Sequence, residues 1–245
     1  MSQTSQRIAL VTGVGRPQGI GFEVCRQLAK QGLMVILTAR DAEKAESNAK
    51  QLTEQGLNVL PKCLDVSSDR SVHQLATEIE AEFSKLDVLV NNAAINFDFQ
   101  QPTIGVDLNT VHETLETNFF GAWRTCEAFL PLIRQSEHGR IVNVSSEAAS
   151  FSSPDGMANK GGVLPSYCVS KAALNAFTVK FATALKDTGV LVNAVCPGYT
   201  ATYPGAEAIG ARPSEEGAAS VMWAALLPDS GPTGGFFRDG KPLPW

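Results

Sequence analysis

Two polar residues one helical turn apart, Tyr167 and Lys171, lie in a segment whose pattern is otherwise mainly apolar. They recur with Leu174, Thr178 and Phe181 at spacings of three and four, so all five share one face of a predicted helix. Lysine is almost never fully buried without a partner. A phenol beside an ammonium group could exchange protons in a cleft, because a neighbouring cation favours the phenolate. The pair alone leaves open the alternative that Lys171 extends into solvent.

Three further polar side chains occupy apolar surroundings. Asn118 interrupts an apolar stripe on a long predicted helix, and a buried amide must find hydrogen-bond partners. Ser145 and Ser146 follow an apolar run at 140–144, where their hydroxyl groups would project from the end of a strand. Each has a structural alternative, because Asn118 could accompany a helix irregularity and serines commonly form turns.

Four glycines, Gly13, Gly15, Gly19 and Gly21, lie between an apolar run at 8–11 and a helical pattern that begins at Phe22. At such a strand-to-helix turn, backbone N–H groups and the positive end of the helix dipole bind the pyrophosphate of a dinucleotide. A glycine-rich loop alone is weak support. Its position between a strand and a helix favours a dinucleotide site, and no Walker A lysine follows it.

The elements that would position these residues alternate between short β-rich runs and longer helical patterns. Strands are predicted at 7–12, 34–38, 58–64, 88–91, 140–144, 190–196 and 234–237, and helices at 20–31, 42–55, 69–83, 107–134, 166–186 and 214–226. Pro61 suits an edge strand, which the third strand is in the doubly wound order 3-2-1-4-5-6. We therefore expect an α/β fold of the Rossmann type: a doubly wound, seven-stranded parallel sheet with helices on both faces, in a single domain at 1–245.

Charge and composition restrict the partners. The net charge is −5 and the basic residues are scattered, so neither nucleic acid nor an anionic membrane is expected to bind. Five cysteines without C-x-x-C spacing look like reduced core residues, which favours a cytoplasmic location. The three histidines lie far apart, so no metal site is predicted. No apolar run approaches about 18 residues, so no membrane span is expected.

The segment after the second predicted strand bears on the choice between NAD and NADP. An acidic residue there often hydrogen-bonds the ribose 2′-hydroxyl, but this chain has Arg40 followed by Asp41. A guanidinium pairs well with the 2′-phosphate of NADP, and Arg16 in the glycine loop could assist. We predict NADP(H) as the cofactor. Asp41 keeps NAD open, as does the alternative that both arginines are solvated surface residues.

The chain resembles the classical short-chain dehydrogenases/reductases over essentially its whole length. The resemblance rests on motifs in order at predicted strand ends: Thr12-Gly13 with Gly19-Ile20-Gly21, Asp65, Asn91-Asn92-Ala93, Asn118, Ser146, Tyr167-x-x-x-Lys171 and Pro197-Gly198. Segments at 37–41, 117–121 and 234–237 look like those of the NADPH-dependent carbonyl reductases. Tyr-x-x-x-Lys is weakly specific by itself, whereas the whole series is very specific.

This resemblance implies four catalytic roles. Tyr167 would be the general acid that protonates a carbonyl oxygen, and Ser146 would hydrogen-bond and polarise that oxygen. Lys171 would bind the nicotinamide ribose and lower the pKa of the tyrosine, and Asn118 would hold a water that links Lys171 to solvent.

The resemblance also implies which residues bind the cofactor. Asp65 would contact the adenine, Asn91 the adenosine-side backbone and Thr202 the nicotinamide carboxamide. The full expected set is Gly13, Arg16, Gly19, Ile20, Gly21, Arg40, Asp65, Val66, Asn91, Ala93, Tyr167, Lys171, Pro197, Gly198, Thr200 and Thr202.

Coulomb's law supports the pairing of Tyr167 with Lys171. A free tyrosine has a pKa of about 10, too high for easy proton exchange near neutrality. A cation about 4 Å away at an effective dielectric of roughly 20 contributes on the order of 4 kcal/mol, or roughly three pKa units before any desolvation cost. We therefore expect the pKa of Tyr167 to lie near 7.

Three departures from the family pattern affect the site. Five residues, 14–18, separate the first two motif glycines where the family has three, which leaves the phosphate contacts and the role of Arg16 open. Ala94 stands where glycine is usual. The loop between Ser146 and Tyr167 is longer than usual but much shorter than in the monomeric carbonyl reductases, and we expect it to form one wall of the substrate pocket.

These observations predict an NADPH-dependent reductase of ketones or aldehydes. An apolar or aromatic substrate is expected, because several aromatic side chains could reach the cleft and no basic cluster could hold a carboxylate: Phe97, Phe99, Phe151 and Tyr203. The alternatives are a 3-oxoacyl-thioester reductase and a cofactor-sensing protein without turnover. The resemblance also implies a homodimer or homotetramer packed through the helices predicted at 107–134 and 166–186.

Overall fold

The computed structural model describes residues 6–99, 101–159 and 161–245. One sheet runs through it in the order β3-β2-β1-β4-β5-β6-β7-β8. Its strands are β1 (Ile8–Val11), β2 (Met34–Ala39), β3 (Val59–Cys63), β4 (Val88–Asn91), β5 (Arg140–Val144), β6 (Leu191–Val195), β7 (Phe236–Arg238) and β8 (Lys241–Pro242). The predicted α/β fold and the doubly wound order are confirmed, and Pro61 lies in edge strand β3.

The prediction of seven parallel strands needs one correction. The first seven strands pair in parallel, but β8 is an additional strand that pairs antiparallel with β7. The two strands are joined by Asp239 and Gly240, whose φ angles of 53° and 74° are both positive. That is the backbone of a two-residue hairpin turn, for which Asp-Gly is a favoured sequence.

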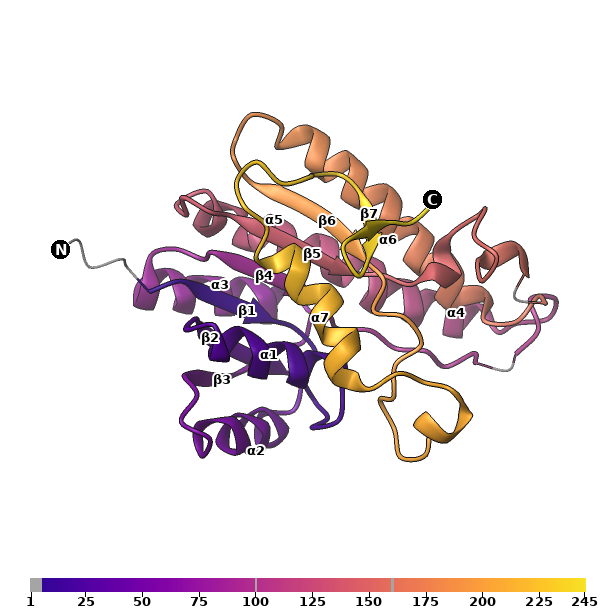
Figure 1. Cartoon of the computed structure of the whole chain (residues 1–245), viewed down its shortest axis with the longest axis horizontal. Coiled ribbons are helices and arrows are strands. Elements are labelled where there is room, and N and C mark those ends of the chain that lie inside the picture. Colours follow the sequence, from indigo (N-terminus) through magenta and orange to yellow (C-terminus); the bar gives the residue numbers. More distant parts are fainter. Residues whose placement is uncertain (1–5, 100, 160) are drawn as a thin grey trace.

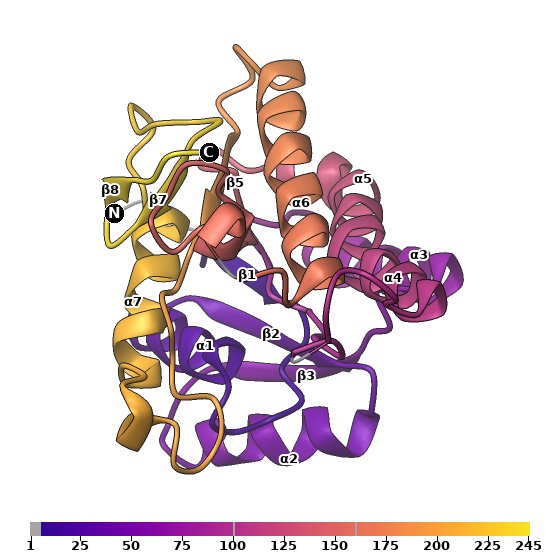
Figure 2. The same cartoon turned by 90° about the vertical axis from the view of Figure 1, so that its right-hand side faces the viewer.

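Helices cover both faces of the sheet (Figures 1 and 2). They are α1 (Ile20–Lys30), α2 (Ala42–Thr53), α3 (Asp69–Phe83), α4 (Leu108–Leu115), α5 (Gly121–Ile133), α6 (Pro165–Ala184) and α7 (Ser214–Ala225). Figure 2 shows α1, α2 and α7 on one side of the strands and α3 to α6 on the other. Each layer buries its own apolar cluster against the sheet, and the two clusters use alternate residues of the strands, as Leu10 and Val11 of β1 illustrate.

The helix predicted at 107–134 is present as one unbroken helical run from Leu108 to Ile133, but it is not α-helical throughout. It consists of α4, a π-turn at Glu116–Phe120 and α5. Two constraints coincide at the π-turn. The side chain of Asn118 turns into the protein and hydrogen-bonds the backbone of Ile95. Gly121 packs closely on Val66: a Cβ added to the glycine would lie 2.7 Å from Cγ2 of the valine. The extra residue of a π-turn lets both contacts form on one helix.

In the described parts of the chain, none of the helices has the length and apolar character that crossing a bilayer requires.

Candidate functional site

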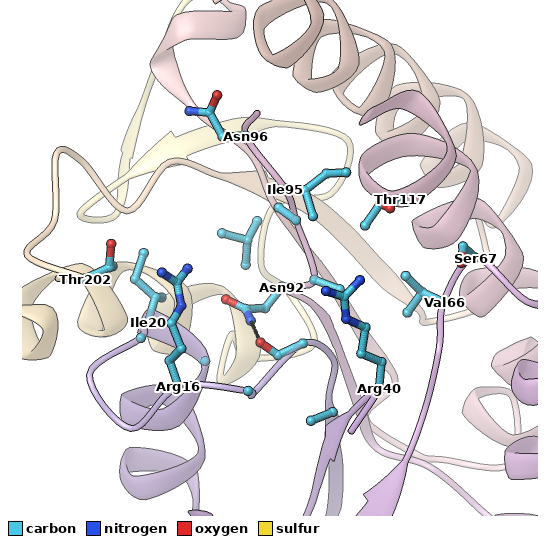
Figure 3. Close-up of a pocket in the computed structure, with 18 of the residues that line it drawn as sticks. Arg16, Ile20, Arg40, Val66, Ser67, Asn92, Ile95, Asn96, Thr117 and Thr202 are labelled. Atoms are coloured by element: carbon cyan, nitrogen blue, oxygen red, sulfur yellow. Dashed lines mark hydrogen bonds between the residues drawn. The ribbon is translucent and has the colours of Figure 1, made fainter. Parts of the chain in front are cut away.

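A cavity of about 830 Å³ opens at the carboxyl ends of the strands, as the doubly wound fold predicts. Segments that follow β1 to β6 all contribute to its wall. Figure 3 shows that Arg16 and Ile20 enter it from one side and Val66, Ser67 and Thr117 from the other, with Asn92 between them. The cavity is large enough for a dinucleotide together with part of a second ligand.

The glycine loop lies directly against the segment after β4. Gly13 has a φ of 74°, and a Cβ there would overlap the backbone of Ala93. A Cβ on Gly21 would overlap the amide of Asn92. That amide donates to the carbonyl oxygen of Thr12 at 2.8 Å, so the ends of β1 and β4 are joined beneath the cavity. These two glycines let the loop pack directly on the segment after β4, and the loop together with the start of α1 forms a backbone cradle where a pyrophosphate would bind.

The additional residues of the glycine loop form a turn at the rim of the cavity. Gly19 N–H donates to the carbonyl oxygen of Arg16 at 3.1 Å, which closes the turn. Its start is held from two sides, because Val14 N–H donates to Thr38 and the amide of Asn48 donates to the carbonyl oxygen of Val14 at 2.8 Å. The insertion thus leaves the cradle intact and moves the guanidinium of Arg16 to the cavity rim.

Two arginines and one carboxylate occupy the rim where the adenosine end of a cofactor would lie. Asp41 is engaged elsewhere, because it caps α2 by accepting from Lys44 N–H at 3.3 Å and pairs with the ammonium of Lys44. Arg16 and Arg40 both line the cavity and are exposed (Figure 3). Neither forms an ion pair with any residue that the structure describes. The rim can therefore offer guanidinium groups to an anion.

Tyr167 and Lys171 line the other end of the cavity, both from the first turns of α6. Lys171 is only 2% exposed, and its Nζ donates to the carbonyl oxygen of Val144 at 2.7 Å. Its Nζ lies 5.8 Å from the centroid of the Tyr167 ring. The alternative in which the lysine extends into solvent is therefore wrong.

The expected pKa of Tyr167 needs correction. Burial raises it to about 12, and a hydrogen bond with Ser146 lowers it only in part. Burial likewise lowers the pKa of Lys171 to about 8. The value near 7 was expected before any desolvation cost, and burial is the largest cause of the pKa shift of both groups. In the structure both groups are buried, and burial favours the neutral form of each.

Ser145 and Ser146 differ in what their hydroxyl groups contact. Ser145 is buried and donates to Asn175 Oδ1 at 2.6 Å. Ser146 caps the short turn Glu147–Ala149 by accepting from Ala148 N–H at 3.2 Å, and it also hydrogen-bonds Tyr167. Ser146 is thus the serine that adjoins the phenol.

Asn118 fastens the cavity wall to the helices behind it. Its Oδ1 accepts from Ile95 N–H at 2.8 Å, and its Nδ2 donates to the carbonyl oxygen of Ile95 at 2.9 Å and to Ser170 Oγ at 3.0 Å. The amide therefore places Ile95, which lines the cavity, without lining it.

Three of the expected cofactor residues are not among the residues that line the cavity. Asn91 is buried and donates to Asn143 Oδ1 at 2.9 Å. Thr200 Oγ1 donates to the carbonyl oxygen of Pro197 at 3.0 Å, and Gly198 packs against the guanidinium of Arg212. The remaining expected cofactor residues line the cavity: Gly13, Arg16, Gly19, Ile20, Gly21, Arg40, Asp65, Val66, Ala93, Tyr167, Lys171, Pro197 and Thr202.

Several lining residues lie outside the sequence prediction. Asn92, Ala94, Ile95 and Asn96 form one continuous wall after β4, and Thr117 faces it from the π-turn. The position of 92–96 directly after a central strand is a signal that could have identified them. Thr117 gave no such signal, because its orientation depends on the π-turn. Among the described residues, no three His, Cys, Asp or Glu side chains are grouped so that they could hold a metal ion.

This chain is similar to known proteins over nearly its whole length. The family model described as short chain dehydrogenase matches residues 7–209. (+)-Neomenthol dehydrogenase of Arabidopsis thaliana is 34% identical over 97% of each protein, and carbonyl reductase (NADPH) 1 of Sus scrofa is 34% identical over 99% of this chain and 95% of its own length. A metagenomic short-chain oxidoreductase solved in complex with NADP matches with a TM-score of 0.76 and 28% identity over 93% of each chain.

The burial of Lys171 predicts a pH dependence of stability. Because burial lowers its pKa from 10.5 to about 8, the unfolded chain binds one more proton than the folded chain between those values. The free energy of unfolding should therefore rise with pH across this window, by about 3 kcal/mol in total from this group. In Lys171→Met this rise should be missing, as measured by urea denaturation at several pH values. Lys186→Met, at an exposed position, should keep it, and parallel pH dependences in all three proteins would contradict the prediction.

Proposed function

The chain belongs to the short chain dehydrogenase family, and we propose that it is an NADPH-dependent reductase that converts ketones or aldehydes to alcohols. One observation carries the proposal. The buried pair Tyr167 and Lys171 lies at one end of a cavity whose other end carries the glycine cradle and the guanidinium groups of Arg16 and Arg40, which make no ion pair with a described residue. Cofactor and proton donor can thus meet at one substrate. We treat residues 1–245 as one domain, and a cytoplasmic location stays a prediction from the sequence.

The residues present fit NADP(H). The glycine loop lines the cavity at the N-terminus of α1, where backbone N–H groups can bind a pyrophosphate, and Arg16 and Arg40 on the cavity rim can pair with a 2′-phosphate. The name of the pig relative includes NADPH, and the metagenomic relative was solved with NADP. When bound, the reduced nicotinamide supplies a hydride to the carbonyl carbon.

The chain's own residues would supply the proton and hold the carbonyl group. The phenolic O–H of Tyr167 donates its proton to the carbonyl oxygen, and Ser146, which adjoins the phenol, donates a hydrogen bond to the same oxygen. Because the pKa of Tyr167 lies well above 7, the phenol is protonated at neutral pH, as a proton donor must be. Lys171 stabilises the phenolate that remains.

An apolar carbonyl compound fits the substrate end best. Ile95 and Phe97 line the cavity, whereas Phe99, Phe151, Tyr203 and the loop between Ser146 and Tyr167, which were also expected there, are not among its lining residues. Lys171 is the basic lining residue beside Tyr167, and it already donates to Val144, so the described residues offer no further cation there to hold a carboxylate. A 3-oxoacyl thioester remains the alternative substrate, and a cofactor-sensing protein is the alternative that requires no turnover.

The primary test is the rate of NADPH oxidation with an activated aromatic ketone. We expect turnover, and Tyr167→Phe should lower kcat by at least about 100-fold because it removes the general acid. NADPH binding, followed by nucleotide fluorescence, should be nearly unchanged in the variant. Activity confined to acyl thioesters would favour the first alternative. Tight NADPH binding without turnover on any carbonyl compound would favour the sensing protein.

Cofactor preference tests the role of Arg40. A charged hydrogen bond to a phosphate contributes about 1.5–3 kcal/mol, so Arg40→Ala should raise the KM for NADPH by roughly 10-fold or more. The KM for NADH should change little, because NADH has no 2′-phosphate. Arg134→Ala, at an exposed position on the far end of α5, is the control and should leave both constants unchanged. Equal effects of Arg40→Ala on the two cofactors would contradict the assignment.

We also propose that two copies associate through α4, the π-turn, α5 and α6. Apolar side chains are exposed on these elements: Leu108, Phe120, Trp123, Val169 and Val179. The Trp123 ring stacks on the buried ring of Phe177 at 4.8 Å between centroids, so the indole is held in place at the surface. Such a patch is typical of a protein interface.

A charge in this patch should separate the copies. Trp123→Glu should convert an oligomer to a monomer at micromolar concentration, as measured by light scattering, because association would bury the carboxylate. Ile209→Glu, at an exposed apolar residue outside the patch, should leave the oligomer intact. A wild-type monomer at that concentration would overturn the proposal.

A further inference from the structure

A fully buried carboxylate, Asp98, lies in the loop that follows β4. Its side chain is 0% exposed, whereas its neighbours Phe97 and Phe99 are 52% and 59% exposed. The loop therefore points the carboxylate inward and the two phenyl rings outward. Phe97 lines the substrate end of the cavity. A charged residue rarely occupies such a position without a specific partner.

The partner of Asp98 is the start of the catalytic helix. Asp98 Oδ2 accepts from the backbone N–H of Ser166 and from Ser166 Oγ, both at 2.6 Å. Ser166 Oγ also lies 3.2 Å from Thr114 Oγ1 of α4. Ser166 immediately precedes Tyr167 on α6. The carboxylate thus holds the residue next to the proposed general acid.

Helix α6 lacks a capping side chain of its own. Its N-cap is Leu164, which has a left-handed φ of 62° and makes no side-chain hydrogen bond to the first turn. Pro165 follows at the first helical position. Asp98 therefore satisfies an N–H of the first turn from a distant loop, and its negative charge complements the positive end of the helix dipole.

Other contacts bind the same loop to the segment before α6. The backbone N–H and the hydroxyl of Thr103 both donate to the carbonyl oxygen of Gly162, at 2.8 Å and 2.7 Å. Pro102 and Val163 form an antiparallel β-bridge. The wall after β4 and the start of α6 are thus joined near Thr103, through Asp98 and, further back, through Asn118 to Ser170.

We propose that Asp98 is a positioning residue. Its hydrogen bonds to Ser166 fix the loop that carries Phe97 relative to Tyr167, the residue that follows Ser166. The inference rests on the proposed function, because it gives the aligned groups their roles. Asp98 acts by holding the backbone in place and not by changing the pKa of Tyr167. That pKa is shifted by burial, by the hydrogen bond with Ser146 and by two cysteines, and Asp98 is not among the causes.

Two substitutions at one position test this proposal. Asp98→Ala removes the acceptor of Ser166 and should lower kcat with an aromatic ketone at least 10-fold and raise its KM, while the dissociation constant of NADPH changes less than 2-fold. Asp98→Asn keeps an acceptor oxygen of the same shape and should restore kcat to within about 3-fold of wild type. The pH profile of kcat should keep its midpoint in both variants.

The matched control is Asp107→Ala, which removes a local helix cap of the same type from α4. It should lower the melting temperature without changing kcat. Asp98→Ala should instead show a loss of kcat out of proportion to its change in melting temperature. The proposal is overturned if Asp98→Asn is as inactive as Asp98→Ala, or if NADPH binding and stability fall in parallel with kcat.

Hydrogen exchange tests the contact independently of the reaction. Amide exchange in the first turn of α6 should accelerate in Asp98→Ala, remain near wild type in Asp98→Asn, and be unaffected by Asp107→Ala. If no carbonyl compound is turned over, the proposed function fails but this measurement still decides whether Asp98 holds α6. Unchanged exchange at residues 166–170 in Asp98→Ala would refute the positioning role.

Discussion

The hydrogen bond from Lys171 Nζ to the carbonyl oxygen of Val144 is the contact on which the candidate site depends. An ammonium group taken out of water needs a strong acceptor, and the carbonyl of the last residue of β5 supplies one at 2.7 Å. The bond fixes the depth at which α6 packs on the sheet. Because Tyr167 lies one turn earlier on the same helix, its height above the strand ends is fixed as well.

Two further polar residues on the same face of α6 hydrogen-bond residues in or directly after β5. Asn175 accepts from Ser145 Oγ at 2.6 Å, and Thr178 accepts from the amide of Asn143 at 2.9 Å. Lys171, Asn175 and Thr178 recur at spacings of four and three, so they form one polar seam against β5. A slip of α6 along the strand would break all three of these contacts with β5 and Ser145. The seam thus specifies one register, which an apolar interface of similar size would define less sharply.

The sequence was sufficient for the sheet order, because alternating strand and helix patterns allow few topologies and Pro61 marks the edge. It was also sufficient to bring most predicted cofactor residues to one cavity, since strand ends meet at one edge. It did not predict the π-turn at Glu116–Phe120, because that turn depends on the close packing of Gly121 on Val66, a contact between residues far apart in sequence. The inward orientation of Asn91 depends on Asn143 and Thr125 and was equally invisible to strand-end reasoning.

The pKa values of Tyr167 and Lys171 depend on burial, which residue spacing does not reveal. Spacing alone places a cation one turn from Tyr167, whereas burial gives a lysine with a pKa of about 8 beside a tyrosine with a pKa of about 12. In the proposed reaction, proton donation by Tyr167 creates a phenolate next to Lys171. A buried anion raises the pKa of a neighbouring amine, so Lys171 retains its proton as the tyrosine loses one. The phenolate that the proposed reaction produces thus favours the ammonium charge that stabilises it.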